Sequence, residues 1–265
     1  MSIDVNGQRV LVTGASSGIG AGLAEEFARR GATVGICARR QDRLDEVLER
    51  CRKHSPDSVR WVCDLSDPTA VDGLAAAAMK ELGGVDILVN NAGIPKRRHV
   101  SRLDPVTVES VMNINFFSPV RLTLALLPHM LERDSGRIIN LSSVAATLSS
   151  PGESAYDASK AALTAFSESM AVDLWQTGIK MLLVYPGLVD TDLFSLPDND
   201  PVLASSVERV PVSELVEGVF DALDRDAIQV YVPAFFGDLV SGKAANVERF
   251  LAGTAKYIAD QQREG

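Results

Sequence analysis

Short apolar runs alternate with amphipathic stretches along most of this chain. Runs that are rich in β-branched residues and closed by polar residues or glycine are typical of buried parallel strands. Such runs lie at residues 9–12, 33–37, 59–63, 85–89, 137–141 and 180–185. Apolar positions at helical spacing predict helices at residues 18–30, 42–53, 69–81, 106–132 and 153–175. Strands that alternate with helices in this order predict the α/β class, with a Rossmann-like doubly wound parallel sheet.

No change in composition divides the chain, so residues 1–265 are expected to form a single domain. Residues 190–212 contain a loop at 194–210 with two prolines and several acidic or amide side chains. Residues 235–265 form a C-terminal extension with an amphipathic helix at 239–258. This extension could wall a pocket, pack on a partner subunit or dock on a membrane. The mixed charges of its polar face favour membrane docking least.

Composition and charge narrow the class of protein. A hydrophobic content of 46% and a charged content of 23% are ordinary for a globular chain. A net charge of −9 argues against nucleic acid as a partner. The chain contains no run of eighteen apolar residues, so no membrane span is expected. The sequence also shows no signal-peptide core, so export is not expected. Three cysteines without C-x-x-C spacing predict reduced thiols and a cytoplasmic location, and the scattered histidines predict no metal site.

Tyr156 and Lys160 are the first candidates for chemistry. Because they are four residues apart on a predicted helix, their side chains share one face. A free tyrosine has a pKa of ~10, and a neighbouring ammonium should lower that pKa. A serine at the end of the preceding strand, Ser142 or Ser143, could hold a substrate oxygen beside the phenol. Alone, such a Tyr–Lys pair is also common as a solvated surface pair. Together with the other motifs of this chain, the pair indicates proton transfer to a carbonyl oxygen.

A glycine-rich turn joins the first strand to the first helix. Its sequence, from residue 13 to residue 20, is Thr-Gly-Ala-Ser-Ser-Gly-Ile-Gly. Such a turn lets a pyrophosphate approach the backbone at a helix N-terminus. The second strand ends in Ala38, Arg39 and Arg40, where an acidic residue would bind a ribose 2′-hydroxyl. Two guanidinium groups suit a 2′-phosphate instead, so the sequence favours NADP(H) over NAD(H).

Five motifs occur in the order and spacing of the short-chain dehydrogenase/reductase family. They are Thr13-Gly14-x-x-x-Gly18-Ile19-Gly20, Asn90-Asn91-Ala92-Gly93, Ser143, Tyr156-x-x-x-Lys160 and Pro186-Gly187. The match runs from about residue 5 to about residue 195, so the chain resembles this family over most of its length. The resemblance implies a single NAD(P)-binding domain. It also implies an oxidoreductase that interconverts a ketone or aldehyde and a secondary alcohol by hydride transfer.

The resemblance also implies a role for each catalytic residue. Tyr156 would be the general acid or base, and Lys160 would lower its pKa and bind the nicotinamide ribose. Ser143 would hold the substrate oxygen and is preferred over Ser142, because it stands thirteen residues before Tyr156. Asn115 would keep a water in a proton relay to Lys160, and it is preferred over Asn113.

The implied cofactor contacts come from the carboxyl ends of several strands. Asp64 resembles the residue that contacts adenine, Asn91 the residue beside the adenine ribose, and Thr191 the residue that binds the carboxamide. The full set is Gly14, Ser16, Ser17, Gly18, Ile19, Gly20, Arg39, Arg40, Asp64, Leu65, Asn91, Ala92, Gly93, Tyr156, Lys160, Pro186, Gly187, Val189 and Thr191. Ser17 stands where many NADP enzymes carry a basic residue, and Ser118 where the family often has glycine. The preference for NADP(H) therefore depends on Arg39 and Arg40.

Several alternatives stay open. The loop at 190–212 falls where the family's substrate lid lies, and the apolar helices at 106–132 and 153–175 imply a homodimer or homotetramer. The basic cluster at 96–99 is either a solvated loop or a patch that steers an acidic substrate. The substrate is open between a 3-oxoacyl thioester, a lipophilic ketone and a small carbonyl compound. A non-catalytic regulator that senses NADP(H) is the alternative to an enzyme.

Overall fold

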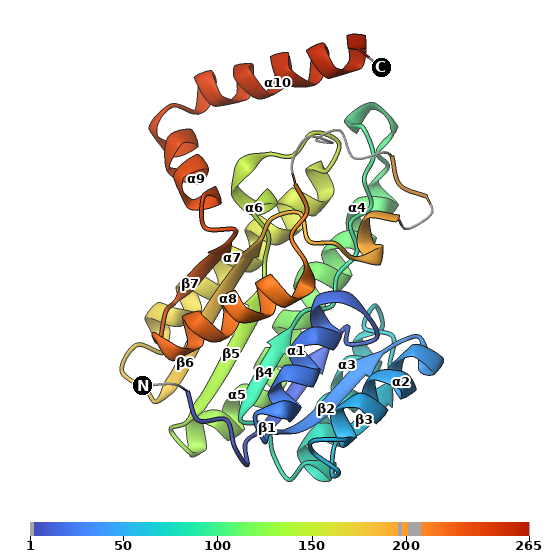
Figure 1. Cartoon of the computed structure of the whole chain (residues 1–265), viewed down its shortest axis with the longest axis vertical. Helices are drawn as coiled ribbons and strands as arrows, with labels where there is room; N and C mark the ends of the chain where they lie inside the picture. The colour runs from blue at the N-terminus through green and yellow to red at the C-terminus, as the bar shows by residue number, and fades with distance from the viewer. Residues whose placement is uncertain (1–2, 196–197, 201–207, 265) are drawn as a thin grey trace.

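A seven-stranded parallel sheet forms the centre of the molecule, with the strand order β3-β2-β1-β4-β5-β6-β7 (Figure 1). The computed structural model describes residues 3–195, 198–200 and 208–264. The strands are β1 Arg9–Thr13, β2 Thr33–Ala38, β3 Val59–Val62, β4 Ile87–Asn90, β5 Gly136–Leu141, β6 Ile179–Pro186 and β7 Gln229–Val232. The predicted α/β class and doubly wound sheet are confirmed.

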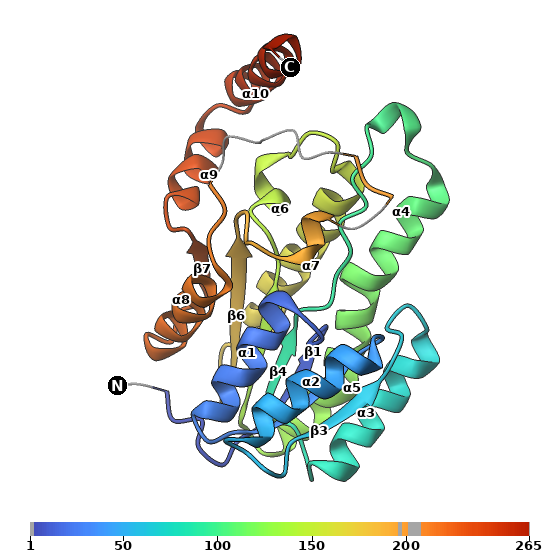
Figure 2. The ribbon, with the colours of Figure 1, turned by 45° about the vertical axis from the view of Figure 1, so that its right-hand side comes forward.

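Helices cover both faces of the sheet (Figure 2). The main helices are α1 Gly18–Arg29, α2 Gln41–Arg52, α3 Pro68–Glu81, α4 Pro105–Met112, α5 Ser118–Glu132, α7 Ser154–Asp173, α8 Val212–Asp224, α9 Phe236–Ala245 and α10 Val247–Glu264. One apolar cluster joins α1, α2 and α8 to the sheet, and a second joins α3, α5 and the end of α7 to its other face. Because both faces are covered, the inner strands are apolar runs without alternation.

Strand β7 and helix α8 were not predicted. The apolar positions of α8 at residues 215, 216, 219, 220 and 223 have helical spacing and pack against α1 and the sheet. Phe220 lies 4.8 Å from Phe27 of α1, measured between ring centroids. Strand β7 has only four residues, Gln-Val-Tyr-Val, and pairs with β6 at the edge of the sheet. A run this short carries little periodicity from which to predict a strand.

Two predicted helices are divided. Residues 105–132 form α4, a π-helical turn at Asn113–Phe117, and α5, with prolines at the start of both α-helices. The amphipathic tail breaks at Asn246 into α9 and α10, and α10 packs mainly on α9, away from the sheet (Figure 2). Within the loop at 190–212, residues 196–197 and 201–207 lie outside the described residues. The described part contains a 3-10 turn, Asp192–Ser195.

The stretch Pro105–Glu132 also bears on the prediction that nothing spans a membrane. By length and composition alone it is long and apolar enough to do so, with a mean hydropathy of 1.2. Core helices of water-soluble folds meet the same criterion, and one third of the eighteen-residue window that meets it is buried. Here α4 packs against α7, and α5 packs against α3. Its apolar composition is therefore partly explained by packing inside this domain.

Candidate active site

A cavity of about 380 Å³ opens at the carboxyl ends of the parallel strands. Ligands of open α/β sheets bind at this edge, where the loops after successive strands converge. All predicted site residues line the cavity except Gly20 and Asn115, which lie behind its wall. The fold therefore brings together residues that are more than 170 positions apart in the sequence, from Gly14 to Thr191.

At Gly14 and Gly18, the glycine turn between β1 and α1 passes too close to other residues for a side chain to fit. Gly14 has a φ of +67°, and a Cβ there would lie 2.7 Å from the Cα of Ala92. Gly18 has a φ of +56°, and its Cβ would lie 3.0 Å from Thr191. Ser17 precedes α1 without a capping side-chain hydrogen bond, so the first amides of the helix face the cavity. This cradle fits a phosphate group, as the sequence predicts.

Asn91 connects the turn to the end of β4. Its side-chain amide donates to the carbonyl oxygens of Thr13 at 2.9 Å and Gly14 at 3.2 Å. The Thr13 hydroxyl in turn accepts hydrogen bonds from the backbone amides of Asn91 and Ala92. The Asn91 amide group therefore holds the shape of the glycine turn, in addition to lining the cavity.

The two arginines after β2 differ in their surroundings. Arg40 donates hydrogen bonds to the hydroxyls of Ser16 at 3.0 Å and Ser17 at 2.8 Å. Arg39 is exposed, lines the cavity and makes no hydrogen bond with any residue that the structure describes. Asp64 lies near Arg39, and hydrogen bonds from Ser66 together with the charge of Arg39 lower its pKa. Arg39 is therefore the arginine whose guanidinium group is available to a ligand.

Tyr156 faces the cavity from the first turns of α7, beside Ser143. Burial raises the pKa of Tyr156, and the charges of Glu153 and Asp157 raise it further, whereas a hydrogen bond with Ser143 lowers it. The prediction that neighbouring residues lower this pKa is wrong for the chain's own side chains. The error arises because burial outweighs the favourable contacts.

The two serines after β5 point in different directions. Ser142 donates to the Lys160 carbonyl and shares a hydrogen bond of 2.8 Å with Thr164, so its hydroxyl is engaged inside the fold. Ser143 lines the cavity together with Tyr156, and its hydroxyl accepts a hydrogen bond from the Ala145 amide. This difference supports Ser143 as the serine that meets a substrate oxygen.

Lys160 lies one turn after Tyr156 and is only 4% exposed. Its ammonium donates to the Leu141 carbonyl at 2.7 Å and lies 5.7 Å from the centroid of the Tyr156 ring. Burial lowers the pKa of Lys160 to about 8. A Cβ at Gly93 would lie 3.2 Å from the Asn115 amide oxygen and 3.6 Å from this ammonium, so Gly93 packs closely against both side chains.

Asn115 belongs to the π-helical turn and is fully buried. Its side chain bonds both the amide and the carbonyl of Ile94 and donates to Ser159, one residue before Lys160. Asn113 is exposed. The preferred asparagine is thus the buried one behind the cavity wall, and its side chain holds the loop after β4.

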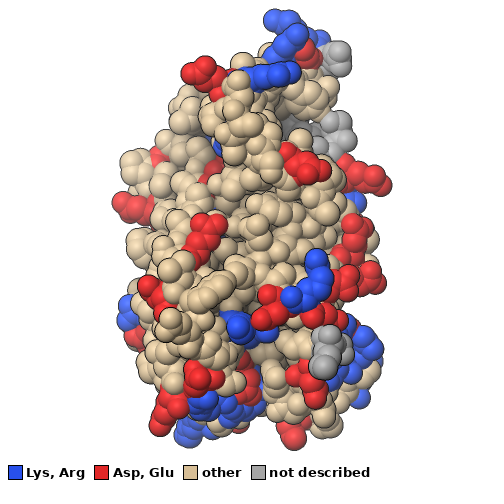
Figure 3. Space-filling model, turned by 90° about the vertical axis from the view of Figure 1, so that its left-hand side faces the viewer, with Lys and Arg blue, Asp and Glu red and all other residues tan. Residues whose placement is uncertain are grey.

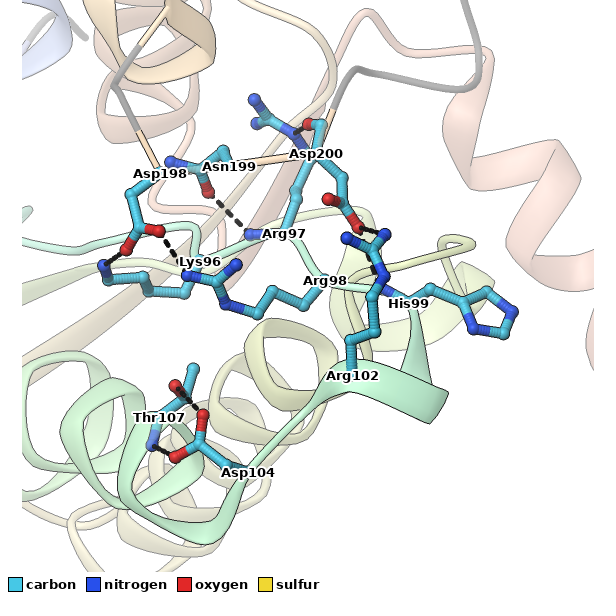
Figure 4. A network of polar contacts seen from close by, with 10 residues as sticks. All are labelled: Lys96, Arg97, Arg98, His99, Arg102, Asp104, Thr107, Asp198, Asn199 and Asp200. Atoms are coloured by element: carbon cyan, nitrogen blue, oxygen red, sulfur yellow. Dashed lines mark hydrogen bonds and ion pairs between the residues drawn. The ribbon is translucent and has the colours of Figure 1, made fainter.

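Glu153 at the cavity and the acidic partners of the basic cluster at 96–99 were not predicted. Glu153 lines the cavity three residues before Tyr156, and this helical spacing could have revealed it. Lys96 and Arg98 pair with Asp198, and Arg102 pairs with Asp200 (Figure 4). The basic cluster is therefore neither a purely solvated loop nor a free patch for an acidic substrate.

The sequence and fold match known proteins over most of the chain. The model of the short chain dehydrogenase family matches residues 8–200. A fatty acyl-CoA reductase of Acinetobacter baylyi is 40% identical over 72% of this chain, and the match spans 66% of that relative. Dehydrogenase/reductase SDR family member 7B of Rattus norvegicus is 39% identical over 94% of this chain and 76% of its own length.

Solved structures add a likeness in fold. A short-chain dehydrogenase from Sphingobium yanoikuyae, in complex with NADPH, is 30% identical with a TM-score of 0.80, covering 91% of this chain and 95% of its own. A short-chain dehydrogenase/reductase from Burkholderia phymatum, in complex with NAD, has a TM-score of 0.84, covering 93% of this chain and 96% of its own. At 22% identity it shows the fold alone. With the family model matched over most of its length and the site assembled around Tyr156 and Lys160, this chain belongs to the short-chain dehydrogenase family of NAD(P)-dependent oxidoreductases.

Proposed function

We propose that this protein is an NADP(H)-dependent oxidoreductase that interconverts a carbonyl compound and an alcohol. The observation that carries the proposal is that Tyr156 and Ser143 lie at one cavity, with the buried Lys160 ammonium beside the tyrosine ring. The glycine cradle at Gly14 and Gly18 fits the pyrophosphate of such a cofactor. A bound nicotinamide supplies or accepts the hydride.

In the direction of reduction, the chain's own residues would handle the proton. Ser143 and Tyr156 would hold the carbonyl oxygen by two hydrogen bonds. As the carbonyl carbon gains a hydride, negative charge develops on that oxygen, and the Tyr156 hydroxyl gives up its proton to form the alcohol. Lys160 lies close enough to stabilise the phenolate that remains. Oxidation of the alcohol would run through the same steps in reverse.

The preference for NADP(H) is supported by the free guanidinium group of Arg39 at the adenosine end of the cavity. Arg40, which is bonded to Ser16 and Ser17, would add a second positive charge there. Guanidinium groups bind phosphate by charge-assisted hydrogen bonds, and a 2′-phosphate is what distinguishes the two cofactors. The Sphingobium relative in complex with NADPH is consistent with this assignment.

For the substrate, we favour a lipophilic carbonyl compound, including an acyl thioester. The substrate end of the cavity is walled mainly by apolar side chains, namely Ile94, Pro95, Val144, Leu188 and Leu193. Two relatives, from Acinetobacter baylyi and Mycobacterium tuberculosis, are named fatty acyl-CoA reductases. Both the cavity lining and these names favour an apolar substrate over a small polar one.

We also propose a homodimer or homotetramer in the cytoplasm. Phe117, Leu124 and Leu131 are seven residues apart and each is about half exposed, so they form one apolar stripe along α5. Such stripes are typically covered by a partner. The three cysteines are free, buried thiols, which suits a reducing compartment.

Turnover with a panel of carbonyl compounds and NADPH tests the proposal. Tyr156→Phe keeps the ring and removes the acid, so it should lower turnover by about 10²–10⁴-fold while NADPH still binds. Tyr257→Phe, on α10, is the matched control and should leave turnover unchanged. An unmodified protein that binds NADPH but reduces no compound of the panel would favour a non-catalytic sensor. Tyr156→Phe turning over at the original rate would reject the catalytic role of Tyr156.

A further inference from the structure

Glu153 is an acidic residue at the substrate end of the cavity for which the proposed mechanism has no role. It immediately precedes α7 and lies one helical turn before Tyr156, and both side chains line the same cavity. Its side chain is only 15% exposed. Among the residues that the structure describes, its carboxylate has one charged partner, Arg97, at 3.9 Å, and no hydrogen bond. A carboxylate so little solvated acts on its neighbours with little screening.

Arg97 reaches Glu153 from the loop after β4 and is itself 3% exposed. Its Nε donates to the carbonyl of Asp200 at 3.0 Å, and its backbone amide donates to Asn199 at 2.6 Å. Figure 4 shows Arg97 extending toward the segment at 198–200 from the basic loop. These bonds fix the guanidinium group near Glu153 but do not join the two by a direct hydrogen bond. The negative charge is therefore only partly compensated.

The other charged and polar groups around Tyr156 come from three elements. Asp157 and Lys160 lie on α7, Ser143 follows β5, and Lys243 of α9 acts on Asp157. In the alkaline range where a tyrosine ionises, the two carboxyl groups carry negative charge and oppose a phenolate. The charges of Glu153 and then Asp157 raise the pKa of Tyr156, after burial itself. Lys160 and a bound nicotinamide act in the opposite sense.

We propose that Glu153, held by Arg97, is a positioning residue that keeps the Tyr156 hydroxyl protonated and so ready to donate. This inference rests on the proposed function of Tyr156 as the general acid. Its consequence is directional: carbonyl reduction uses the protonated tyrosine, whereas alcohol oxidation needs the phenolate. With Glu153 present, carbonyl reduction therefore continues to higher pH, and alcohol oxidation begins only at higher pH.

The test is an ultraviolet titration of Tyr156 in the full chain with bound NADP⁺, which requires no substrate. The phenolate signal of Tyr156 is obtained by subtracting the titration of Tyr156→Phe. We expect Glu153→Gln to move the midpoint down by at least about half a pH unit, roughly threefold in the acid dissociation constant. Glu153→Asp keeps the charge and should stay near the original midpoint. Asp173→Asn removes a charge at the far, exposed end of α7 and should leave the midpoint unchanged.

Equal midpoints in the original protein and Glu153→Gln would overturn the proposal, and so would the absence of any Tyr156 titration below the pH of unfolding in both proteins. Where a substrate is found, the pH profile of kcat/KM for alcohol oxidation should move down by the same amount in Glu153→Gln. A shifted titration without turnover of any carbonyl compound would reject the proposed enzymatic function and keep the effect of Glu153 on Tyr156.

Discussion

Asp157 shows how burial sets the behaviour of single side chains around this site. One carboxylate oxygen accepts a hydrogen bond of 2.7 Å from the Ser150 amide. The other is buried and has no partner among the described residues. Burial and the charge of Glu153 raise the pKa of Asp157 to about 7, against the opposing effects of that bond and of Lys243. Folding therefore favours the protonated form of Asp157, relative to the unfolded chain.

This raised pKa makes stability depend on pH in a definite direction. Between about pH 4 and pH 7 the unfolded chain has lost the Asp157 proton while the folded chain retains it, so stability falls as pH rises. Asp157→Asn removes this effect. The difference in unfolding free energy between Asp157→Asn and the original protein should therefore be about 2–4 kcal/mol more favourable to the variant at pH 8 than at pH 4.

Urea unfolding at both pH values measures this gain. The exposed residue Asp173, changed to asparagine, is the matched control and should show no comparable gain. A difference between Asp157→Asn and the original protein that does not change with pH would show that the folded protein does not favour protonated Asp157.

Arg39 decides the proposed cofactor preference. Replacing it by aspartate should weaken NADPH binding by about 2–3 kcal/mol, because charge-assisted bonds to the 2′-phosphate are lost. The new carboxylate could accept hydrogen bonds from the ribose hydroxyls of NADH, so the preference should reverse. Titration of both nucleotides measures this. Lys53→Asp makes the same change of charge at the far end of α2 and should leave the ratio of affinities unchanged. Equal affinities in the unmodified protein would contradict the assignment.

Among the elements of the fold, the junction of β1 and α1 leaves little room for a larger residue. Asn91 ties the turn to β4, and Gly14 has both a positive φ and a backbone atom of Ala92 directly against it. Two elements far apart in the sequence thus meet where no side chain fits. The cradle for the cofactor is a product of this contact.

Gly14→Ala should therefore lower both stability and nucleotide affinity. The substitution strains the backbone by about 1–3 kcal/mol and pushes the Ala92 segment out of place. Gly73→Ala is the control: Gly73 lies within α3, and a Cβ there meets nothing within 4 Å. It should raise stability by about 0.5–1 kcal/mol, since alanine favours helices. Thermal unfolding with and without NADPH measures both effects. Similar results for the two variants would show that the turn is not tightly packed.

Across the whole molecule, large apolar side chains remain exposed along α5 and at the end of α7. Leu124 is 54% exposed, and Val172 and Trp175 are exposed by 73% and 70%. Few charged side chains also lie across the middle of the side where β7 forms the edge of the sheet (Figure 3). A monomer would leave these surfaces in water.

Leu124→Glu should convert the proposed homo-oligomer into a monomer at micromolar concentration. A carboxylate at the centre of the α5 stripe would be desolvated on association, which is costly. Sedimentation velocity measures the change. Val62→Glu, at an exposed apolar position on β3, is the control and should keep the assembly. A monomeric unmodified protein whose activity does not change on dilution would reject the oligomer.

The sequence by itself determined six of the seven strands, the helices between them and the family. Buried parallel strands must be apolar runs, and the glycine turn and the Tyr–Lys spacing follow from local geometry that neighbours in sequence reveal. It also placed nearly all predicted site residues at one cavity, because parallel strands end at the same edge. Four features were not predicted, because they depend on packing against distant segments. They are strand β7, helix α8, the break before Ser118 and the break at Asn246.

Only the tertiary structure decided the electrostatics of the site. The pKa of Tyr156 depends on how much water reaches it, on Glu153 and Asp157 beside it in sequence, and on Ser143, which the fold brings from the end of β5. The basic side chains of the loop after β4 likewise form ion pairs with Asp198 and Asp200, about a hundred residues later in the sequence. Charge–charge energies depend on distance and burial in space, and neither quantity can be read from spacing along a chain.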